Sequence, residues 1–166
     1  MKYLNVILIF LFSAFLYTML NFYDNGWQYL QPFLIAILLI YFNIENPWLY
    51  YTFAFVSGLF IDSFSGVFGL HSFIFLFIIW LLKTLQLTIF TSRNMLTIIL
   101  LTFFAFVFFW LVFFSVNFFA SWELYTLNKE IIFSILKMML VNILLVTIIH
   151  LVYYNFWLKK HERQSF

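Results

Sequence analysis

The residues of this sequence that could do chemistry gather between positions 58 and 71, in the stretch GLFIDSFSGVFGLH. Asp62 is an acid in strongly apolar surroundings, and His71 carries an imidazole that changes charge near neutral pH. Because an ionisable group inside a membrane is costly and often functional, Asp62 is a candidate proton or cation relay, or a polar contact for a partner helix. The structural alternative is that Asp62 caps the start of the next helix and holds the loop before it.

The same stretch is rich in small residues, which suits close contact between backbones. Small and polar residues recur at the helical spacing of three or four, at Gly58, Asp62, Ser65, Gly66 and Gly69. Such a face lets another helix approach closely. If the segment bends instead, its glycines permit positive φ, and its free N–H groups can bind the side chains of Asp62, Ser63 and Ser65.

Neither a metal site nor an enzyme is predicted. Asp62 and His71 are nine positions apart, too far for a pair on one helix, and no second His or carboxylate lies at metal-ligand spacing. Cysteine is absent, and the sequence contains no hydrolase elbow, P-loop, HExxH pair or dinucleotide-binding glycine pattern. We therefore expect no catalytic residue, no cofactor and no metal ligand.

Two polar residues interrupt the last apolar segment. Lys137 is expected to extend toward the outer membrane surface beside Glu130 or Glu123, and the alternative is an ion pair with Asp62. Asn142 is expected to form an interhelical hydrogen bond worth about 1 kcal/mol.

Composition defines the elements that must position these residues. Hydrophobic residues make up 66% of the 166 residues and charged residues only 8%, whereas soluble domains have about 25% charged residues. Because a bilayer core of about 30 Å needs about 20 apolar residues per helix, we predict a single all-α integral membrane domain with six transmembrane helices. Their approximate ranges are 3–22, 29–43, 47–61, 70–90, 95–119 and 130–157.

Helix-start signals and basic residues support this division. Asn46 before Pro47, Asn94, and Asn128 with Glu130 shortly after it are typical of helix starts. With the N-terminus in the cytoplasm, the outer connections contain only Lys129, while the cytoplasmic segments contain Lys2, Lys83, Arg93, Lys159, Lys160 and Arg163. This bias predicts that both termini are cytoplasmic.

The stretch from position 58 to 71 resembles the signature of MreD, the family of rod shape-determining membrane proteins of bacteria. That family shows Gly-x-x-x-Asp, then Ser-Gly, then Gly-Leu with a polar or basic residue, followed by an apolar helix. Gln31-Pro32 is similar to the polar-Pro pair that opens the family's second span, and Asn142 looks like the Asn common in its last span. The proline that often follows this Asn in the family is missing, and Leu145 stands near its place.

The resemblance implies a non-catalytic scaffold of the cell-elongation machinery in the bacterial cytoplasmic (inner) membrane, which maintains rod shape by helping to organise lateral peptidoglycan synthesis. It implies as partners MreC, the glycosyltransferase RodA with its penicillin-binding transpeptidase, and indirectly MreB filaments. It also implies a six-helix fold similar to the substrate-binding components of energy-coupling-factor vitamin transporters. The candidate partner-docking or structural residues are Pro32, Gly58, Asp62, Ser65, Gly66, Gly69, His71 and Asn142.

The alternative function is a substrate-binding membrane component of a small-molecule transporter. Such a component should have a polar ligand cavity on its outer side and small-x-x-x-small contacts on its first helix. The first apolar segment offers only adjacent Ser13 and Ala14 among large side chains, which favours the scaffold. The net charge of +2, without a basic run, gives no indication of nucleic-acid binding.

Overall fold

The computed structural model describes residues 2–22, 30–44, 46–65, 67–89, 95–119 and 128–153. Within these ranges the secondary structure is helical, as predicted. The six helices are α1 (Lys2–Phe22), α2 (Pro32–Asn43), α3 (Pro47–Ser65), α4 (Leu70–Thr88), α5 (Met95–Phe119) and α6 (Lys129–Tyr153).

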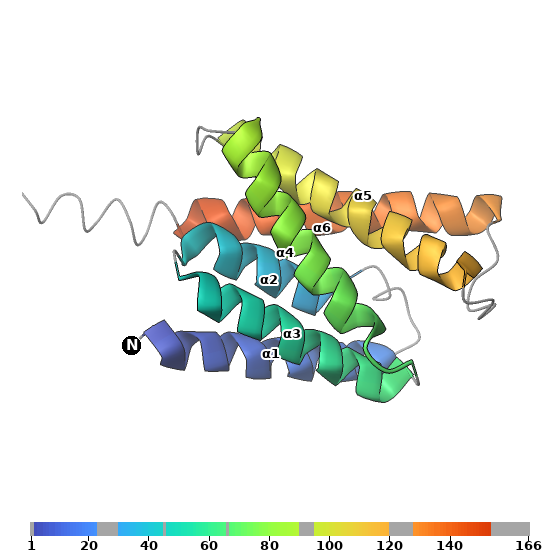
Figure 1. Cartoon of the computed structure of the whole chain (residues 1–166), viewed down its shortest axis with the longest axis horizontal. Coiled ribbons are helices and arrows are strands. Elements are labelled where there is room, and N and C mark those ends of the chain that lie inside the picture. The colour runs from blue at the N-terminus through green and yellow to red at the C-terminus, as the bar shows by residue number, and fades with distance from the viewer. Residues whose placement is uncertain are drawn as a thin grey trace, which may run out of the picture.

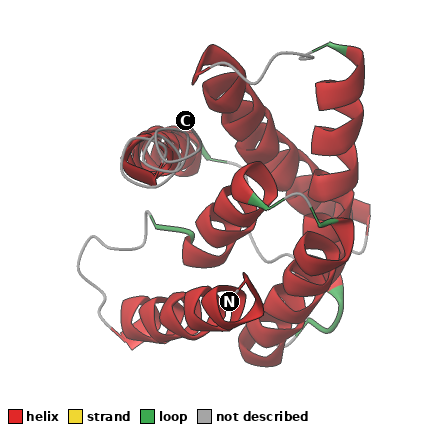
Figure 2. Cartoon of the chain, turned by 90° about the vertical axis from the view of Figure 1, so that its left-hand side faces the viewer, coloured by secondary structure: helices red, strands yellow, loops and turns green. Residues whose placement is uncertain are grey.

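Successive helices run in alternating directions along the long axis of the molecule (Figure 1). As a result, α6 ends at the same end of the molecule at which α1 begins. Helices α4 and α5 cross obliquely over the others (Figure 1), and in the end-on view of Figure 2 α2 lies in the middle of the molecule, between α1 near the N label and α6 near the C label. The largest helix contact is between α3 and α4, whereas α1 and α6 each pack against α2.

Four of the described helices are long and apolar enough to cross a membrane, namely α1, α4, α5 and α6. Helix α2 has only 12 residues, or about 18 Å at 1.5 Å per residue, well short of the bilayer core of about 30 Å. The predicted second segment is therefore a helix, but it begins at Pro32 rather than at position 29, which lies outside the described residues.

Helix boundaries agree with the prediction for the first and fifth segments and differ for others. Helix α3 continues to Ser65, four residues beyond the predicted end at 61, so Asp62 lies on a helix rather than in a loop. The start of α3 has the predicted cap, because the Asn46 side chain accepts a hydrogen bond of 3.1 Å from the backbone N–H of Trp48. The predicted cap at Asn94 and residues 154–157 of the last segment lie outside the described residues.

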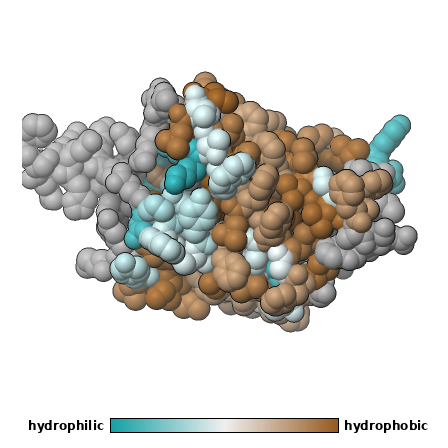
Figure 3. Space-filling view, in the orientation of Figure 1, coloured by the Kyte–Doolittle hydropathy of each residue, from teal (hydrophilic) through white to brown (hydrophobic). Residues whose placement is uncertain are grey.

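The core is centred on α2, because none of the residues of this helix is exposed. Five of its residues are at most 1% exposed: Phe33, Leu34, Ile37, Leu38 and Ile40. Helix α1, by contrast, has a row of exposed large side chains that includes Leu4, Leu8 and Leu11. The face in Figure 3 is dominated by hydrophobic residues, with hydrophilic colours toward its two ends. This surface is that of a membrane protein.

Candidate functional site

The contact between α3 and α4 is unusually close because Gly58 has no side chain. A Cβ atom placed on Gly58 would lie 2.3 Å from both Cα and N of Ser72 and 2.7 Å from the carbonyl carbon of His71. The first turn of α4 therefore lies directly on the backbone of α3. The close approach expected at Gly58 is confirmed, and it occurs between two helices of the same chain.

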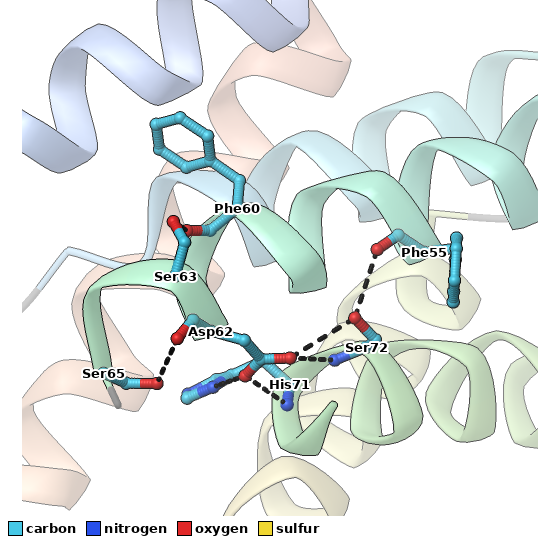
Figure 4. A network of polar contacts seen from close by, with 7 residues as sticks. All are labelled: Phe55, Phe60, Asp62, Ser63, Ser65, His71 and Ser72. Carbon is cyan, nitrogen blue, oxygen red and sulfur yellow. Dashed lines mark hydrogen bonds and ion pairs between the residues drawn. The ribbon is translucent and has the colours of Figure 1, made fainter. Parts of the chain in front are cut away.

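Asp62 lies one turn further along α3 and supplies the cap that α4 lacks. The residue before α4 is Gly69, which has φ of +86° and no side chain with which to bind the free N–H groups of the first turn. Asp62 Oδ1 accepts a hydrogen bond of 3.0 Å from the backbone N–H of His71, and Oδ2 accepts one of 3.4 Å from that of Ser72. The capping interpretation of Asp62 thus matches the geometry, shown in Figure 4.

His71 also contacts Asp62 through its side chain, which the sequence analysis did not anticipate. The imidazole Nδ1 lies 2.8 Å from Asp62 Oδ1, and the Asp62 side chain is fully buried. Nine positions are too many for two side chains to meet on one helix, as expected. The chain turns back at Gly69, however, and this turn brings His71 of α4 to Asp62 of α3. The other face of the imidazole is enclosed by aromatic rings of Phe75, Phe109 and Phe113, with centroid distances of 6.1–6.4 Å.

Serine hydroxyls complete this network in different ways. Ser72 Oγ donates to the backbone carbonyl of Phe55 at 3.2 Å and lies 3.4 Å from Asp62 Oδ2, so it ties the start of α4 to α3. Ser63 and Ser65 donate to carbonyls of their own helix, those of Phe60 and Asp62. The bent-segment interpretation expected these two hydroxyls to bind free N–H groups. Among the described residues, the bonds that they form are instead to carbonyls of their own helix. Gly66 lies outside the described residues.

A second polar contact joins the start of α2 to α6. Asn142 is fully buried, and its Oδ1 accepts a hydrogen bond of 3.0 Å from the backbone N–H of Gln31, the residue before α2. Its Nδ2 donates to the carbonyl of Met138 at 2.6 Å, and Gln31 Nε2 lies 3.2 Å from Met138 Sδ. Pro32 follows as the first residue of α2 and is buried. The expected interhelical hydrogen bond of Asn142 is confirmed.

The two polar contacts meet at one small cavity of about 110 Å³. Gln31, just before α2, and His71 of α4 line it, together with Tyr17 of α1 and aromatic walls that include Phe33 and Phe109. Gln31 Oε1 is buried without a hydrogen-bond partner among the described residues. The cavity is therefore a small space with polar groups on two sides.

Lys137 does not pair with Asp62, so that alternative was wrong. Its side chain is exposed on α6, and its Nζ lies 4.6 Å from the centroid of the Phe133 ring. The buried carboxylate already has His71 and Ser72 as partners. Among the described residues no group of three His, Cys, Asp or Glu side chains is arranged to hold a metal ion.

Ser72 is the site residue that sequence reasoning missed. A signal was present, because Ser72 is a polar residue in an apolar segment at the third position after a helix-start glycine, where an N–H group needs a partner. No protein family, curated protein or solved structure gives a match to this sequence. The fold and the site define the chain as an all-helical membrane protein in which a side chain of α3 caps the start of α4.

Proposed function

We propose that this chain is a non-catalytic membrane scaffold of the bacterial cell-elongation machinery, which maintains rod shape by helping to organise lateral peptidoglycan synthesis. Its proposed partners are MreC, RodA with its penicillin-binding transpeptidase, and indirectly MreB filaments. The observation that carries the proposal is the Asp62 network, because it occupies the stretch that resembles the MreD signature. In it both carboxylate oxygens serve to hold α3 against α4.

The proposed topology is six crossings of the cytoplasmic (inner) membrane with both termini in the cytoplasm. Two observations support an even number of crossings. Successive helices alternate in direction, and α1 begins at the end of the molecule where α6 ends (Figure 1). The distribution of Lys and Arg supports the cytoplasmic side for that end.

The scaffold would dock its partners through outward-facing apolar helix surfaces. Helices α1 and α6 present many large exposed side chains, such as Phe12 and Phe15 on α1 and Leu140 and Leu144 on α6. The Gly58 and Asp62 contacts would act by fixing the angle between α3 and α4. These residues would thus position a surface rather than touch a partner.

The second candidate, a substrate-binding component of a small-molecule transporter, is favoured by the cavity lined by Gln31 and His71. Its volume of about 110 Å³ is below the roughly 300–1,000 Å³ of pockets that bind drug-sized molecules. The larger groove between α1 and α6 is lined almost entirely by aliphatic side chains and offers few polar groups to orient a small polar molecule, so both spaces favour the scaffold.

A depletion experiment separates the two functions. The chromosomal copy is depleted in a rod-shaped host, cell aspect ratio and vitamin uptake are measured, and a tagged copy is purified in mild detergent with its partners identified by mass spectrometry. We expect rounded cells, normal uptake, and recovery of MreC and RodA with the tagged protein. Rods of normal shape with lost uptake would transfer the assignment to the transporter.

A further inference from the structure

A long groove lies between α1 and α6, with α2 as its floor. Its volume is about 540 Å³, and it is lined almost entirely by aliphatic side chains, among them Leu16 and Leu20 of α1, Ile35 and Leu39 of α2, and Leu145 of α6. A second hollow of about 290 Å³ continues it, because both share Ile9, Leu39 and Ile149.

The polarity of this groove changes along its length. Its continuation is lined by Asn5 and Asn43, near the end of the molecule where α1 begins. Asn43 Nδ2 donates to the carbonyl of Leu39 at 2.8 Å, but Asn43 Oδ1 is buried and has no partner among the described residues. The side-chain amides of Asn5 and Asn43 make this end of the groove polar, so it suits a ligand headgroup that forms hydrogen bonds.

The length of the groove suits an acyl chain of one membrane leaflet. From Leu8 to Leu20 along α1 the groove runs about 18 Å at 1.5 Å per residue, close to the roughly 15 Å that one leaflet contributes to the bilayer core.

We propose that this groove binds one bilayer glycerophospholipid. One acyl chain lies along α2 between α1 and α6, and a headgroup with hydrogen-bond donors, such as ethanolamine, lies at Asn5 and Asn43. The proposal is independent of the scaffold function, since it rests only on the shape and polarity of the groove.

Labelling of α2 distinguishes a lipid in the groove from lipids around the protein, because none of the described residues of α2 is exposed. The protein is reconstituted in nanodiscs with phosphatidylethanolamine carrying a photoreactive diazirine in one acyl chain, and adducts are mapped by peptide mass spectrometry. Lipids around the protein label outward residues such as Leu11 and Leu144. A lipid in the groove also labels α2, at Ile35 or Leu39. Labelling confined to the outward faces overturns the proposal.

A matched pair of variants tests the position of the lipid. Leu145 lines the groove, whereas neighbouring Leu144 is 61% exposed and does not. We expect Leu145→Trp to lower α2 labelling about tenfold, equivalent to about 1.4 kcal/mol of binding free energy, and Leu144→Trp to leave it unchanged. Equal labelling in both variants contradicts the proposal.

Two further measurements keep the test decisive. If Leu145→Trp does not reach the membrane, competition by excess unlabelled phosphatidylethanolamine in the unaltered protein replaces it, and labelling of α2 that does not fall counts against a specific site. A dimer in native mass spectra, without α2 labelling, would assign the groove to a helix of a second copy and overturn the lipid.

Discussion

Neither α2 nor α4 has a capping side chain on the residue before it. In both cases a side chain of another helix accepts a hydrogen bond at the start of the helix. Gly69 before α4 has no side chain, and Gln31 before α2 makes no capping hydrogen bond with its side chain. Helix α4 uses the carboxylate of Asp62, nine residues before His71, whereas α2 uses the amide of Asn142, which is 111 residues away. Free N–H groups at a buried helix start need hydrogen-bond acceptors, and for both helices a neighbouring helix supplies one.

The difference between the two caps is one of charge and redundancy. Asp62 accepts from two backbone N–H groups, contacts the His71 ring and lies beside the Ser72 hydroxyl. Asn142 accepts a backbone hydrogen bond across the interface from Gln31. Charge-assisted hydrogen bonds are about twice as strong as neutral ones. We therefore expect the α3–α4 contact to be the more rigid of the two.

The largest effect is expected for Gly58→Ala. Its new Cβ would overlap the backbone of Ser72 and His71, which cannot move without shifting α4. We expect a loss of more than about 3 kcal/mol in the free energy of unfolding, measured by SDS titration in mixed micelles. Gly69→Ala is the control: it meets no atom within 4 Å, and its positive φ should cost only about 1–2 kcal/mol. A milder effect at Gly58 than at Gly69 would refute the close contact.

Asp62→Ala should rank second, because it leaves the N–H groups of His71 and Ser72 without acceptors. The expected loss is about 2–3 kcal/mol. Asp62→Asn retains one oxygen acceptor and nearly the same size, so it should lose only about 1 kcal/mol, as for ordinary caps. The same titration, together with cell aspect ratio in the depleted strain, measures both. If Asp62→Asn loses all function at normal abundance, the charge acts in a relay or ion pair rather than as a cap.

Asn142→Leu tests the weaker cap. It keeps the number and branching of the side-chain heavy atoms but removes the acceptor of the Gln31 N–H, at an expected cost of about 1–2 kcal/mol in the free energy of unfolding. Gln31→Leu is the matched control, since it keeps that backbone N–H and loses only the side-chain contact with Met138. The free energy of unfolding, measured by the same SDS titration, should be clearly lower for Asn142→Leu than for Gln31→Leu. The reverse order would mean that the Gln31 side chain, not its backbone, holds α2.

Lys137→Met should have the smallest effect. The Lys137 side chain is exposed and contacts only the Phe133 ring among the interactions described above, so the change in unfolding free energy should stay within about 0.5 kcal/mol. Membrane abundance and unfolding of this variant are compared with those of the unaltered protein. A loss of unfolding free energy close to that of Asp62→Ala would instead support an ion pair between Lys137 and Asp62, which the structure does not show.

Local patterns were sufficient to predict the helices but not the way they meet. Hydropathy and helix-start residues predicted the ranges of α1 and α5, and Asn46 was identified as a cap from its position before Pro47. The predicted range of α2 was too long, because Tyr29 and Leu30 were counted with the apolar segment although the helix begins only at Pro32. The end of α3 was placed early, because Asp62 and Ser65 interrupt the apolar pattern although both lie on the helix.

The site was predicted as a list of residues rather than as an arrangement. The small-residue pattern indicated the close approach at Gly58, but it did not show that α4 of the same chain fills the space. The contact of Asp62 with His71 depends on the turn at Gly69, where φ is +86°, and one sequence does not show the conformation of a glycine. The partner of Asn142 was unpredictable for a related reason, since it is a backbone group, and every residue except proline has the same N–H.

The bond between Gln31 and Asn142 also imposes an order of events during synthesis. The two residues are 111 positions apart, and ribosomes add roughly 5–20 residues per second, so the N–H at the start of α2 waits about 6–20 s for its acceptor. Over that interval a helix of 12 residues is too short to be a stable span by itself. This hydrogen bond between α2 and α6 can therefore form only after α6 has been synthesised, so the N–H at the start of α2 lacks its final acceptor while the chain between them is made.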